Sequence, residues 1–422
     1  MNAFSWHDNA LCCEDTPLAE IAHRAGTPCY VYSKAAILDR FHEYDRAFGD
    51  VPHKVCYAVK ANSNLAVLRL LAEAGAGFDI VSGGELFRVL RAGAGPQSVV
   101  FSGVGKTAGE IEFALENGIH SFNCESEPEL ALIDALASRL GVKARVAVRV
   151  NPDVDASTHP YISTGLRENK FGIDIGEVVE VYRRAQTLPN LKLAGVSCHI
   201  GSQMLDAGPT LEAFERLLDL VQRLRAAGIP IRMLDLGGGL GVPYRSSDAR
   251  PGIAAFIAAV REKVAGSDLY LMVEPGRSIV GEAGVLVTRV LYRKSNGGKQ
   301  FIIADAAMND LIRPALYQAH HEIVPVRRSG LGAIVADVVG PVCESGDFLA
   351  RGREIPNVLP GDLLAICTVG AYGFVQSSNY NSRPRAAEVL VDGAGWHVVR
   401  ERETYEDLVR GETARPSDTT GR

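Results

Sequence analysis

The sequence predicts a closed parallel (β/α)8 barrel followed by an all-β domain, and three observations lead to this prediction. Eight strand-like segments alternate with helical segments over about 220 residues, the count and span of such a barrel. After about residue 284 the pattern changes to short apolar runs separated by turn residues, which is typical of a β-sandwich or small Greek-key barrel. Polar residues also fall at the ends of the predicted barrel strands. A doubly wound open sheet is the alternative architecture.

The predicted elements follow one another with little interruption. Hydrophobic periodicity places a helix over residues 34–48, and short apolar runs mark the barrel strands. These strands begin near Val55, Gly77, Ser98, Ile119, Ala144, Leu191, Ile231 and Leu269. Further helices are expected over residues 84–92, 108–117, 127–140, 175–188, 209–227 and 251–265, and later strands over residues 285–292, 301–304, 333–339, 363–367 and 387–391.

The change in pattern sets the expected domain boundaries. Residues 36–284 form the barrel, residues 285–400 the β-sandwich domain, and residues 401–422 a polar tail. Residues 1–35 are a lead-in that contains an apolar stretch near Cys29. We expect this stretch to be a strand that pairs into the β domain.

Composition and charge exclude several classes of partner. The 44 Lys and Arg against 50 Asp and Glu give a net charge of −6, which argues against a nucleic-acid or anionic-membrane partner. No apolar run approaches the length of a membrane-spanning helix, and residues 1–15 lack the pattern of a secretory signal. The eight cysteines include no Cys-x-x-Cys pair, so we expect reduced thiols in a cytoplasmic protein and no metal site.

The stretch around Lys60 is the strongest candidate for chemistry. Val55 to Val59 form an apolar run, and Lys60 follows at its carboxyl end. Desolvation at such a position lowers the pKa of a lysine, and a neutral amine is what forms a Schiff base. Ala58 and Cys56 share the lysine's face of the strand and are small, which leaves room for a flat ligand. The alternative is a surface lysine that caps a strand.

Two later strands end in glycine-rich turns. Residues 237–241 have the sequence GGGLG, whose backbone N–H groups suit an anion such as phosphate, although the turn could merely reverse the chain. Glu274 ends the last barrel strand, where a protonated ring nitrogen would be a partner for its carboxylate. Gly276 offers backbone N–H groups, and Arg277 suits a carboxylate or phosphate. A Glu274–Arg277 ion pair at a loop is the alternative.

A histidine and a loop lie at two other strand ends. His199 follows the sixth strand, where its ring could stack on an aromatic cofactor and Ser202 could bind a phosphate; a purely structural histidine is the alternative. The long loop of residues 159–172 is at the same end of the barrel, where long loops are often functional. Asp79 and Asn151 also fall at strand ends.

The β domain carries its own polar candidates. Cys343 lies beside Glu344 and is far along the chain from the barrel, so a functional role needs another subunit or domain to bring it to the barrel mouth. A buried thiol near a turn is the alternative. Arg313, Tyr317 and Tyr372 are further candidates, and two arginines, Arg277 and Arg313, suit a substrate with a second carboxylate.

Five short motifs, taken together and in this order, resemble the fold-type III pyridoxal-phosphate-dependent decarboxylases. They are YAVKAN at residues 57–62, HIGSQ at 199–203, GGG at 237–239, EPGR at 274–277 and CESGD at 343–347. The resemblance spans residues 25–395, and we find no departure at a position that the chemistry needs. It implies an alanine-racemase-like barrel with a β-sandwich domain, and pyridoxal 5'-phosphate as the cofactor.

The resemblance also implies roles for single residues. Lys60 is expected to form the Schiff base, His199 to stack on the cofactor ring, and Glu274 to pair with the pyridinium nitrogen. The other expected cofactor contacts are Asp79, Ser202, Gly239, Gly276, Arg277 and Tyr372. The expected substrate contacts are Arg277, Arg313, Tyr317, Glu344 and Tyr372. Cys343 is expected to donate a proton across the interface of a homodimer.

The activity that the resemblance implies is the decarboxylation of meso-2,6-diaminopimelate to L-lysine and CO2, the last step of lysine biosynthesis. Decarboxylation of another carboxylated or basic amino acid is the nearest alternative. A racemase would need a tyrosine base, for which Tyr372 is available. A non-catalytic pyridoxal-phosphate carrier is a further alternative, and the β domain with its Cys343 motif argues against it.

Overall fold

The computed structural model describes residues 3–154 and 170–413. The predicted functional loop is therefore largely outside the described residues. The chain divides into two compact units. One comprises Lys34–Ala283 with Gly370–Val375, and the other comprises the chain up to Ser33, Gly284–Val369 and the residues from Gln376 onward.

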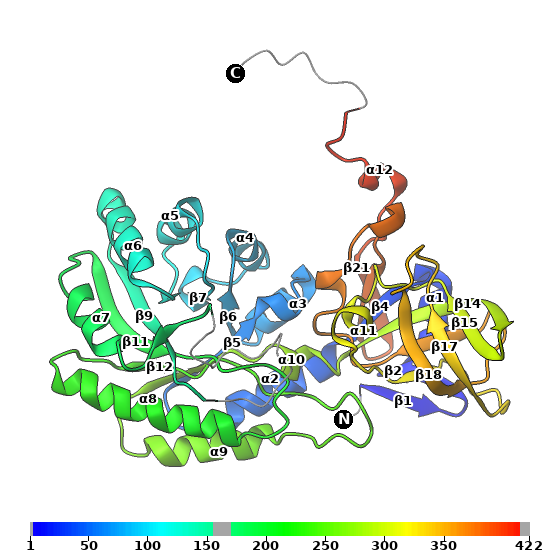
Figure 1. The fold of residues 1–422 in the computed structure, drawn as a ribbon, viewed down its shortest axis with the longest axis horizontal. Coiled ribbons are helices and arrows are strands. Elements are labelled where there is room, and N and C mark those ends of the chain that lie inside the picture. Colours follow the sequence, from blue (N-terminus) through cyan, green and yellow to red (C-terminus); the bar gives the residue numbers. More distant parts are fainter. Residues whose placement is uncertain (1–2, 155–169, 414–422) are drawn as a thin grey trace. The chain divides into compact units, whose positions relative to one another are not determined.

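The first unit is a closed parallel barrel (Figure 1). Its strands are β5 (His53–Ala58), β6 (Gly77–Ile80), β7 (Val99–Phe101), β8 (Ser121–Cys124), β9 (Ala144–Asn151), β11 (Leu191–Ser197), β12 (Met233–Asp235) and β13 (Tyr270–Val273). Each strand pairs in parallel with its neighbours, β8 pairs with β9, and β13 pairs with β5 to close the ring. The predicted barrel is confirmed. The short strand β10 (Ile173–Asp174), which pairs with β9, was not predicted.

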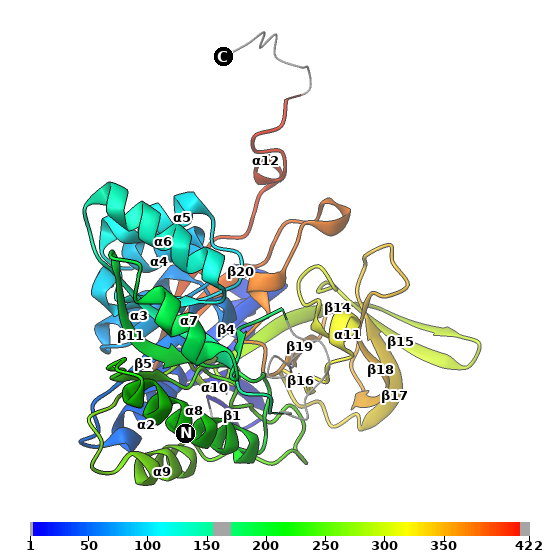
Figure 2. The ribbon, with the colours of Figure 1, turned by 60° about the vertical axis from the view of Figure 1, so that its left-hand side comes forward.

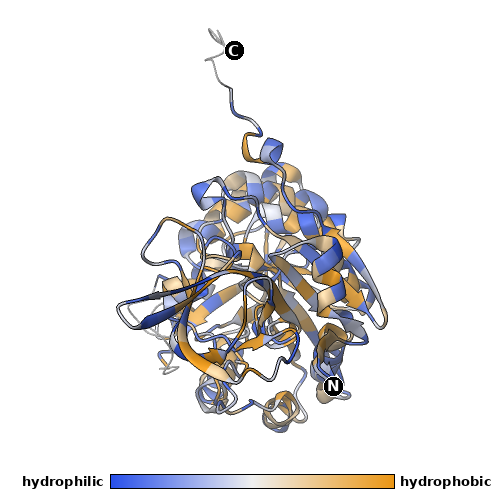
Figure 3. Ribbon diagram, turned by 90° about the vertical axis from the view of Figure 1, so that its right-hand side faces the viewer, coloured by the Kyte–Doolittle hydropathy of each residue, from blue (hydrophilic) through white to orange (hydrophobic). Residues whose placement is uncertain are grey.

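Helices surround the strands of this unit. They are α2 (Lys34–Phe48), α3 (Leu65–Glu73), α4 (Gly83–Arg91), α5 (Ala108–Asn117), α6 (Glu127–Leu140), α7 (Val178–Ala185), α8 (Gly208–Ala226), α9 (Ile253–Val264) and α10 (Arg277–Val280). Asn64, Ser82, Thr107 and Ser126 cap helix starts with side-chain oxygens. Figure 2 shows α8 and α9 side by side, and Figure 3 shows that the outer helices mix hydrophilic and hydrophobic residues. Their apolar faces cover the strands.

Side chains fill the interior of the barrel. Cys56, Val100, Ala147, Met233 and Met272 form one buried apolar cluster, and each comes from a different strand. Such layers make the barrel a packed core rather than a pore. Buried polar residues take over towards the carboxyl ends of the strands, and this change of composition positions the site.

The second unit consists mostly of strands. They are β1 (Phe4–His7), β2 (Ala10–Cys13), β3 (Thr16–Pro17), β4 (Cys29–Ser33), β14 (Gly284–Asn296), β15 (Lys299–Ala304), β16 (Ile323–Pro325), β17 (Ala333–Val339), β18 (Phe348–Pro356), β19 (Leu363–Ile366), β20 (Ala387–Asp392) and β21 (Gly395–Arg400), with helices α1 (Leu18–Ala25), α11 (Arg313–Tyr317) and α12 (Tyr405–Leu408). The N-terminal strand β4 lies between β14, which is antiparallel to it, and β20, which is parallel. The predicted strand near Cys29 is thus part of this sheet.

The sequence did not predict several strands of the second unit. β1, β2 and β3 have four residues or fewer and pair with one another. β18 carries two arginines and a glutamate among its nine residues and pairs only with β17 within the described sheet. These segments lack a clear alternation of apolar and polar residues. They are strands because neighbouring strands pair with them, which the sequence pattern does not reveal. Among the described residues, no helix is long and apolar enough to cross a membrane.

Candidate functional site

Lys60 lies at the carboxyl end of the barrel. β5 ends at Ala58, so Lys60 belongs to the 3-10 turn η1 (Val59–Ala61) and not to the strand. Its Nζ is 2.7 Å from Oδ2 of Asp79, a fully buried residue of β6. Burial lowers the pKa of Lys60, but the carboxylates of Asp79 and Glu274 outweigh that effect and the pKa is raised above its ordinary value. The prediction that desolvation makes this amine neutral is therefore wrong.

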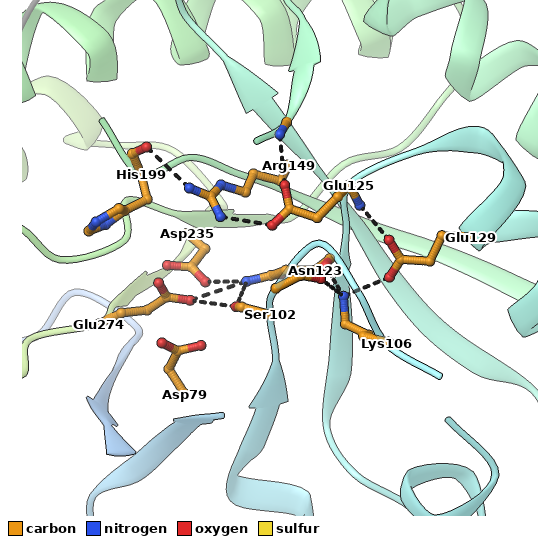
Figure 4. A network of polar contacts seen from close by, with 12 residues as sticks. Asp79, Ser102, Lys106, Asn123, Glu125, Glu129, Arg149, His199, Asp235 and Glu274 are labelled. Atoms are coloured by element: carbon orange, nitrogen blue, oxygen red, sulfur yellow. Dashed lines mark hydrogen bonds and ion pairs between the residues drawn. The ribbon is translucent and has the colours of Figure 1, made fainter. Parts of the chain in front are cut away.

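Three buried carboxyl groups meet at this mouth (Figure 4): Asp79 from β6, Asp235 from the end of β12 and Glu274 directly after β13. Nδ2 of Asn123 donates to Oδ2 of Asp235 at 3.0 Å and to Oε1 of Glu274 at 3.2 Å. Oγ of Ser102 donates to the same Glu274 oxygen at 3.3 Å. Burial, and then the charges of Asp235 and Asp79, raise the pKa of Glu274 well above its ordinary value. The mouth holds an excess of acidic groups.

His199 lies two residues beyond β11, and its ring is held in one orientation. The backbone N–H of Gly238 donates to Nδ1 at 3.2 Å, so the proton of a neutral ring is on Nε2. Nη2 of Arg149 donates to the carbonyl of His199 at 3.4 Å, and its Nη1 donates to Glu125 at 2.8 Å. Burial, and then the charges of Arg149 and Lys60, lower the pKa of His199 well below its ordinary value. The ring is a neutral, flat surface.

Arg277 gathers several of the predicted contacts. Its guanidinium donates to the Tyr244 hydroxyl at 2.6 Å and to Oγ of Ser202 at 3.0 Å, and its Cζ is 4.7 Å from the centroid of the Tyr372 ring. Tyr372 has φ +56°, in the left-handed region, and its N–H donates to the carbonyl of Ala61 at 2.8 Å. Residues other than glycine whose backbone is held in that region often mark functional sites. The structure therefore brings Ser202, Arg277 and Tyr372 together beside the turn that carries Lys60.

Close packing explains a glycine in the turn of residues 237–241. A Cβ on Gly238 would lie 2.2 Å from the carbonyl oxygen of Glu274, so the strand-end loops pack too closely for a larger residue. The N–H of Gly237 donates to Asp235 and that of Gly238 to His199. These two N–H groups orient the site's own side chains. The prediction of an anion contact thus remains for Gly239 and Gly276.

Arg313 and Tyr317 begin and end helix α11 in the second unit. Arg313 is buried, with 6% of its surface exposed, and its Nε lies 3.3 Å from Nε2 of His321. Its Cζ is 5.8 Å from the centroid of the Tyr317 ring, whose hydroxyl accepts a hydrogen bond from Gln376 at 3.4 Å. The structure brings these two candidates together.

Cys343 and Glu344 lie in the loop between β17 and β18 of the second unit. Cys343 is exposed, so the alternative of a buried thiol is wrong. Its N–H donates to Oδ1 of Asn381 at 2.7 Å, and Glu344 accepts a hydrogen bond from the Tyr380 hydroxyl at 3.4 Å. The loop is therefore anchored while its thiol faces outward.

The residues at the mouth of the barrel fit pyridoxal 5'-phosphate. Among the described residues, the buried acceptors Oδ1 of Asp79 and Oδ1 of Asn123 have no hydrogen-bond donor. Within the described part of the chain, three carboxyl groups there face one ammonium, that of Lys60. A protonated ring nitrogen would supply the missing positive charge and donor. The neutral ring of His199 suits a flat aromatic neighbour, and the guanidinium of Arg277 with Ser202 suits a phosphate.

Sequence reasoning missed part of this site. Asp235, Asn123, Ser102, Arg149 and Glu125 all lie at or just beyond the carboxyl ends of barrel strands. The rule that polar residues at these ends are functional would have identified them. These residues belong to one network with the buried carboxyl groups. That network depends on which strand ends are neighbours in the barrel, and the sequence alone does not show it.

Comparison with known proteins gives consistent matches. The sequence profile of a family described as pyridoxal-dependent decarboxylase, pyridoxal binding domain, matches residues 34–281. A diaminopimelate decarboxylase of Pseudomonas aeruginosa is 58% identical over 417 residues, which cover 99% of this chain and all of that protein. The crystal structure of diaminopimelate decarboxylase from Helicobacter pylori complexed with L-lysine is 45% identical, with a TM-score of 0.89, and covers 93% of this chain and 98% of that one. The corresponding structure from M. jannaschii in co-complex with L-lysine is 38% identical, with a TM-score of 0.93 and 98% of both chains covered.

Proposed function

The chain belongs to the diaminopimelate decarboxylases, within the pyridoxal-dependent decarboxylase family, and from this membership we propose that it converts meso-2,6-diaminopimelate to L-lysine and CO2. The observation that carries the proposal is the acidic network of Asp79, Asp235 and Glu274 next to Lys60 at the carboxyl end of the barrel. That network suits a cationic ring, and such a ring can accept the electron pair that the departing carboxyl group leaves behind. The enzyme would complete lysine biosynthesis.

We propose that the barrel residues hold pyridoxal 5'-phosphate. Lys60 would hold the group covalently, with Asp79 positioning the lysine. Glu274 would pair with the ring nitrogen, and His199 would lie against the ring. The phosphate would be held by Ser202, Gly239, Gly276, Arg277 and Tyr372. When bound, the cofactor supplies the electron sink for the bond that releases CO2.

The chain's own residues provide the proton and charge handling. Glu274 keeps a negative charge where the ring nitrogen is positive, and Asn123 and Ser102 fix its carboxylate through two hydrogen bonds. The exposed thiol of Cys343 is the proposed donor of the proton that replaces the lost carboxyl group. Arg313 and Arg277 bind the distal carboxylate of the substrate, and Tyr317, Glu344 and Tyr372 complete the substrate contacts.

Substrate choice separates this proposal from its nearest alternative. The loaded protein should release CO2 from meso-diaminopimelate and much less from ornithine or lysine, because those substrates lack the distal carboxylate that two arginines would bind. The assay measures CO2 release from the three amino acids at equal concentration. A specificity constant for ornithine or lysine above that for diaminopimelate would replace the proposed substrate with a basic amino acid and leave the family unchanged.

We propose that the enzyme works in the cytoplasm as a homodimer with shared sites, Cys343 of one chain serving Lys60 of the other. All eight cysteines are free thiols, which suits a reducing compartment. The position of Cys343 in the second unit, and its exposure, suit a residue that acts in another chain.

Two inactive variants test the shared site. Lys60→Ala and Cys343→Ala are mixed under conditions in which subunits exchange. Random pairing makes about half of the dimers mixed, and each mixed dimer has one intact and one doubly altered site, so activity should return to about a quarter of the parental value per site. A site built within one chain predicts no recovery. A mixture that exchanges subunits and stays inactive would therefore exclude the shared site.

A further inference from the structure

A cavity lies at the opposite end of the barrel from Lys60. Its volume is about 320 Å³, within the range of small-molecule sites. Lys54, Gln97, His120, Tyr270 and Met272 are among its lining residues, from the amino ends of β5, β7, β8 and β13. Met272 belongs to the packed apolar cluster inside the barrel, so this cluster separates the cavity from the catalytic mouth.

Two buried nitrogen atoms at this end of the barrel lack partners. Among the described residues, Nε2 of His120 and Nε of Arg145 make no hydrogen bond. Buried polar groups almost always have a partner, and an exception points to a water, an ion or a ligand. His120 lines the cavity, and the charge of Arg145 acts on both His120 and Tyr270. The cavity is therefore where a partner for the His120 nitrogen would lie.

The electrostatic character of the cavity is positive. Lys54 lines it, and its ammonium has three hydrogens to donate; among the described residues it donates to the carbonyl of Gly75 at 2.9 Å. The charged groups that act on His120 are Arg145 and Lys54, and both are cations. Burial, and then these two charges, lower the pKa of His120 to about 4, so the ring is neutral at neutral pH and carries one N–H donor.

We propose that this basal cavity binds a small anion, the carboxylate or phosphate group of a small molecule, with Lys54 as its ionic partner and His120 as a hydrogen-bond donor. Arg145 does not line the cavity, but its positive charge acts on His120. The cavity is independent of the proposed decarboxylation, because the residues proposed for that reaction lie elsewhere. A site of this kind at the amino end of the barrel would let the protein respond to a metabolite that never enters the catalytic mouth.

Histidine NMR tests the proposal on the full-length, cofactor-loaded protein. Histidine is labelled with ¹³C, the His120 signal is assigned with His120→Gln, and inorganic phosphate and acetate are titrated separately at neutral pH and constant ionic strength. The His120 signal should shift and saturate with at least one of the two anions. Lys54→Met should weaken that affinity about tenfold, since it removes the ionic partner, and Arg145→Met should weaken it by a smaller factor, since it removes a nearby positive charge.

A matched control separates a site from general surface charge. Lys192, at the start of β11, is an exposed lysine on the same end of the barrel, and Lys192→Met should leave the affinity unchanged. Turnover should be the same in all of these variants. Saturation with phosphate alone identifies a phosphate group as the ligand, and saturation with acetate alone identifies a carboxylate. If neither anion saturates the His120 signal, or if Lys54→Met and Arg145→Met bind as tightly as Lys192→Met, the proposal is overturned.

Discussion

Replacing Glu274 with glutamine should affect activity and stability in opposite directions. The substitution keeps the shape of the side chain and the oxygen that accepts hydrogen bonds from Ser102 and Asn123, but it removes the negative charge. In the loaded enzyme the ring nitrogen then loses its partner. Loss of one preorganised electrostatic contact typically costs about 10²–10³ in turnover number, and we expect a fall of that size.

The cofactor-free protein should respond in the other direction. The pKa of Glu274 is raised in the folded chain by burial, and then by Asp235 and Asp79. The folded state therefore holds the proton to a higher pH than the unfolded chain does, and stability falls as the pH rises above the ordinary range of a glutamate. Above the folded-state pKa, each unit by which the pKa is raised lowers the free energy of unfolding by about 1.4 kcal/mol. Glu274→Gln removes this loss, so the cofactor-free variant should be more stable than the parent at neutral pH.

Glu110→Gln is the matched control. Glu110 belongs to the capping box of α5, and backbone N–H groups of Gly83 and Thr107 lower its pKa. The same substitution should therefore reduce stability at neutral pH and leave turnover unchanged. Denaturant unfolding across pH, with CO2 release by the loaded protein, measures both effects. A Glu274→Gln turnover number within about threefold of the parent, or a cofactor-free variant less stable than the parent at neutral pH, would refute the reasoning.

Three further substitutions test other parts of the site. Lys60→Ala should lose the absorbance of the covalently held cofactor and its fixation by borohydride; a variant that still becomes covalently labelled would contradict the role of Lys60. Arg313→Lys keeps the charge but loses the two-pronged contact with a carboxylate, so the specificity constant for diaminopimelate should fall while that for a substrate without the distal carboxylate changes little; equal effects on both would argue against the distal contact. Gly239→Ala places a Cβ 2.3 Å from Cε of Met204 at φ +109°, and unfolding should become easier by about 1–3 kcal/mol; an unchanged unfolding midpoint would show that the turn can relax.

The elements that were predicted well carry their own boundary signals. Helix α6 begins and ends where the sequence predicts, because Ser126 caps its first turn and Gly141 takes the left-handed conformation at its end. The elements that were missed lack such signals. Apolar and polar residues do not alternate clearly along strand β18. It forms a strand because it pairs antiparallel with β17.

The candidate site was predictable residue by residue but not as an arrangement. All strands of a parallel barrel point the same way, so their carboxyl ends lie at one mouth. This rule is why the sequence identified Lys60, His199 and Glu274 as candidates. Asp79 and Glu274 become neighbours of Lys60 only because β13 pairs with β5 and β5 pairs with β6. This closure joins residues far apart in the chain. The sequence therefore shows which groups lie at the mouth. The distances show which of them are close enough to change one another's pKa.

That shared charge corrects the expected behaviour of Lys60. Considered alone, a desolvated lysine should be neutral, but Asp79, whose Oδ2 lies 2.7 Å from the Lys60 Nζ, keeps it an ammonium in the protein without cofactor. The ammonium and a protonated ring nitrogen are then two ways of balancing the same carboxyl groups. When the lysine nitrogen holds the cofactor, a protonated ring nitrogen would supply positive charge beside Glu274. The buried carboxyl groups would then be balanced by a cation in both forms of the protein.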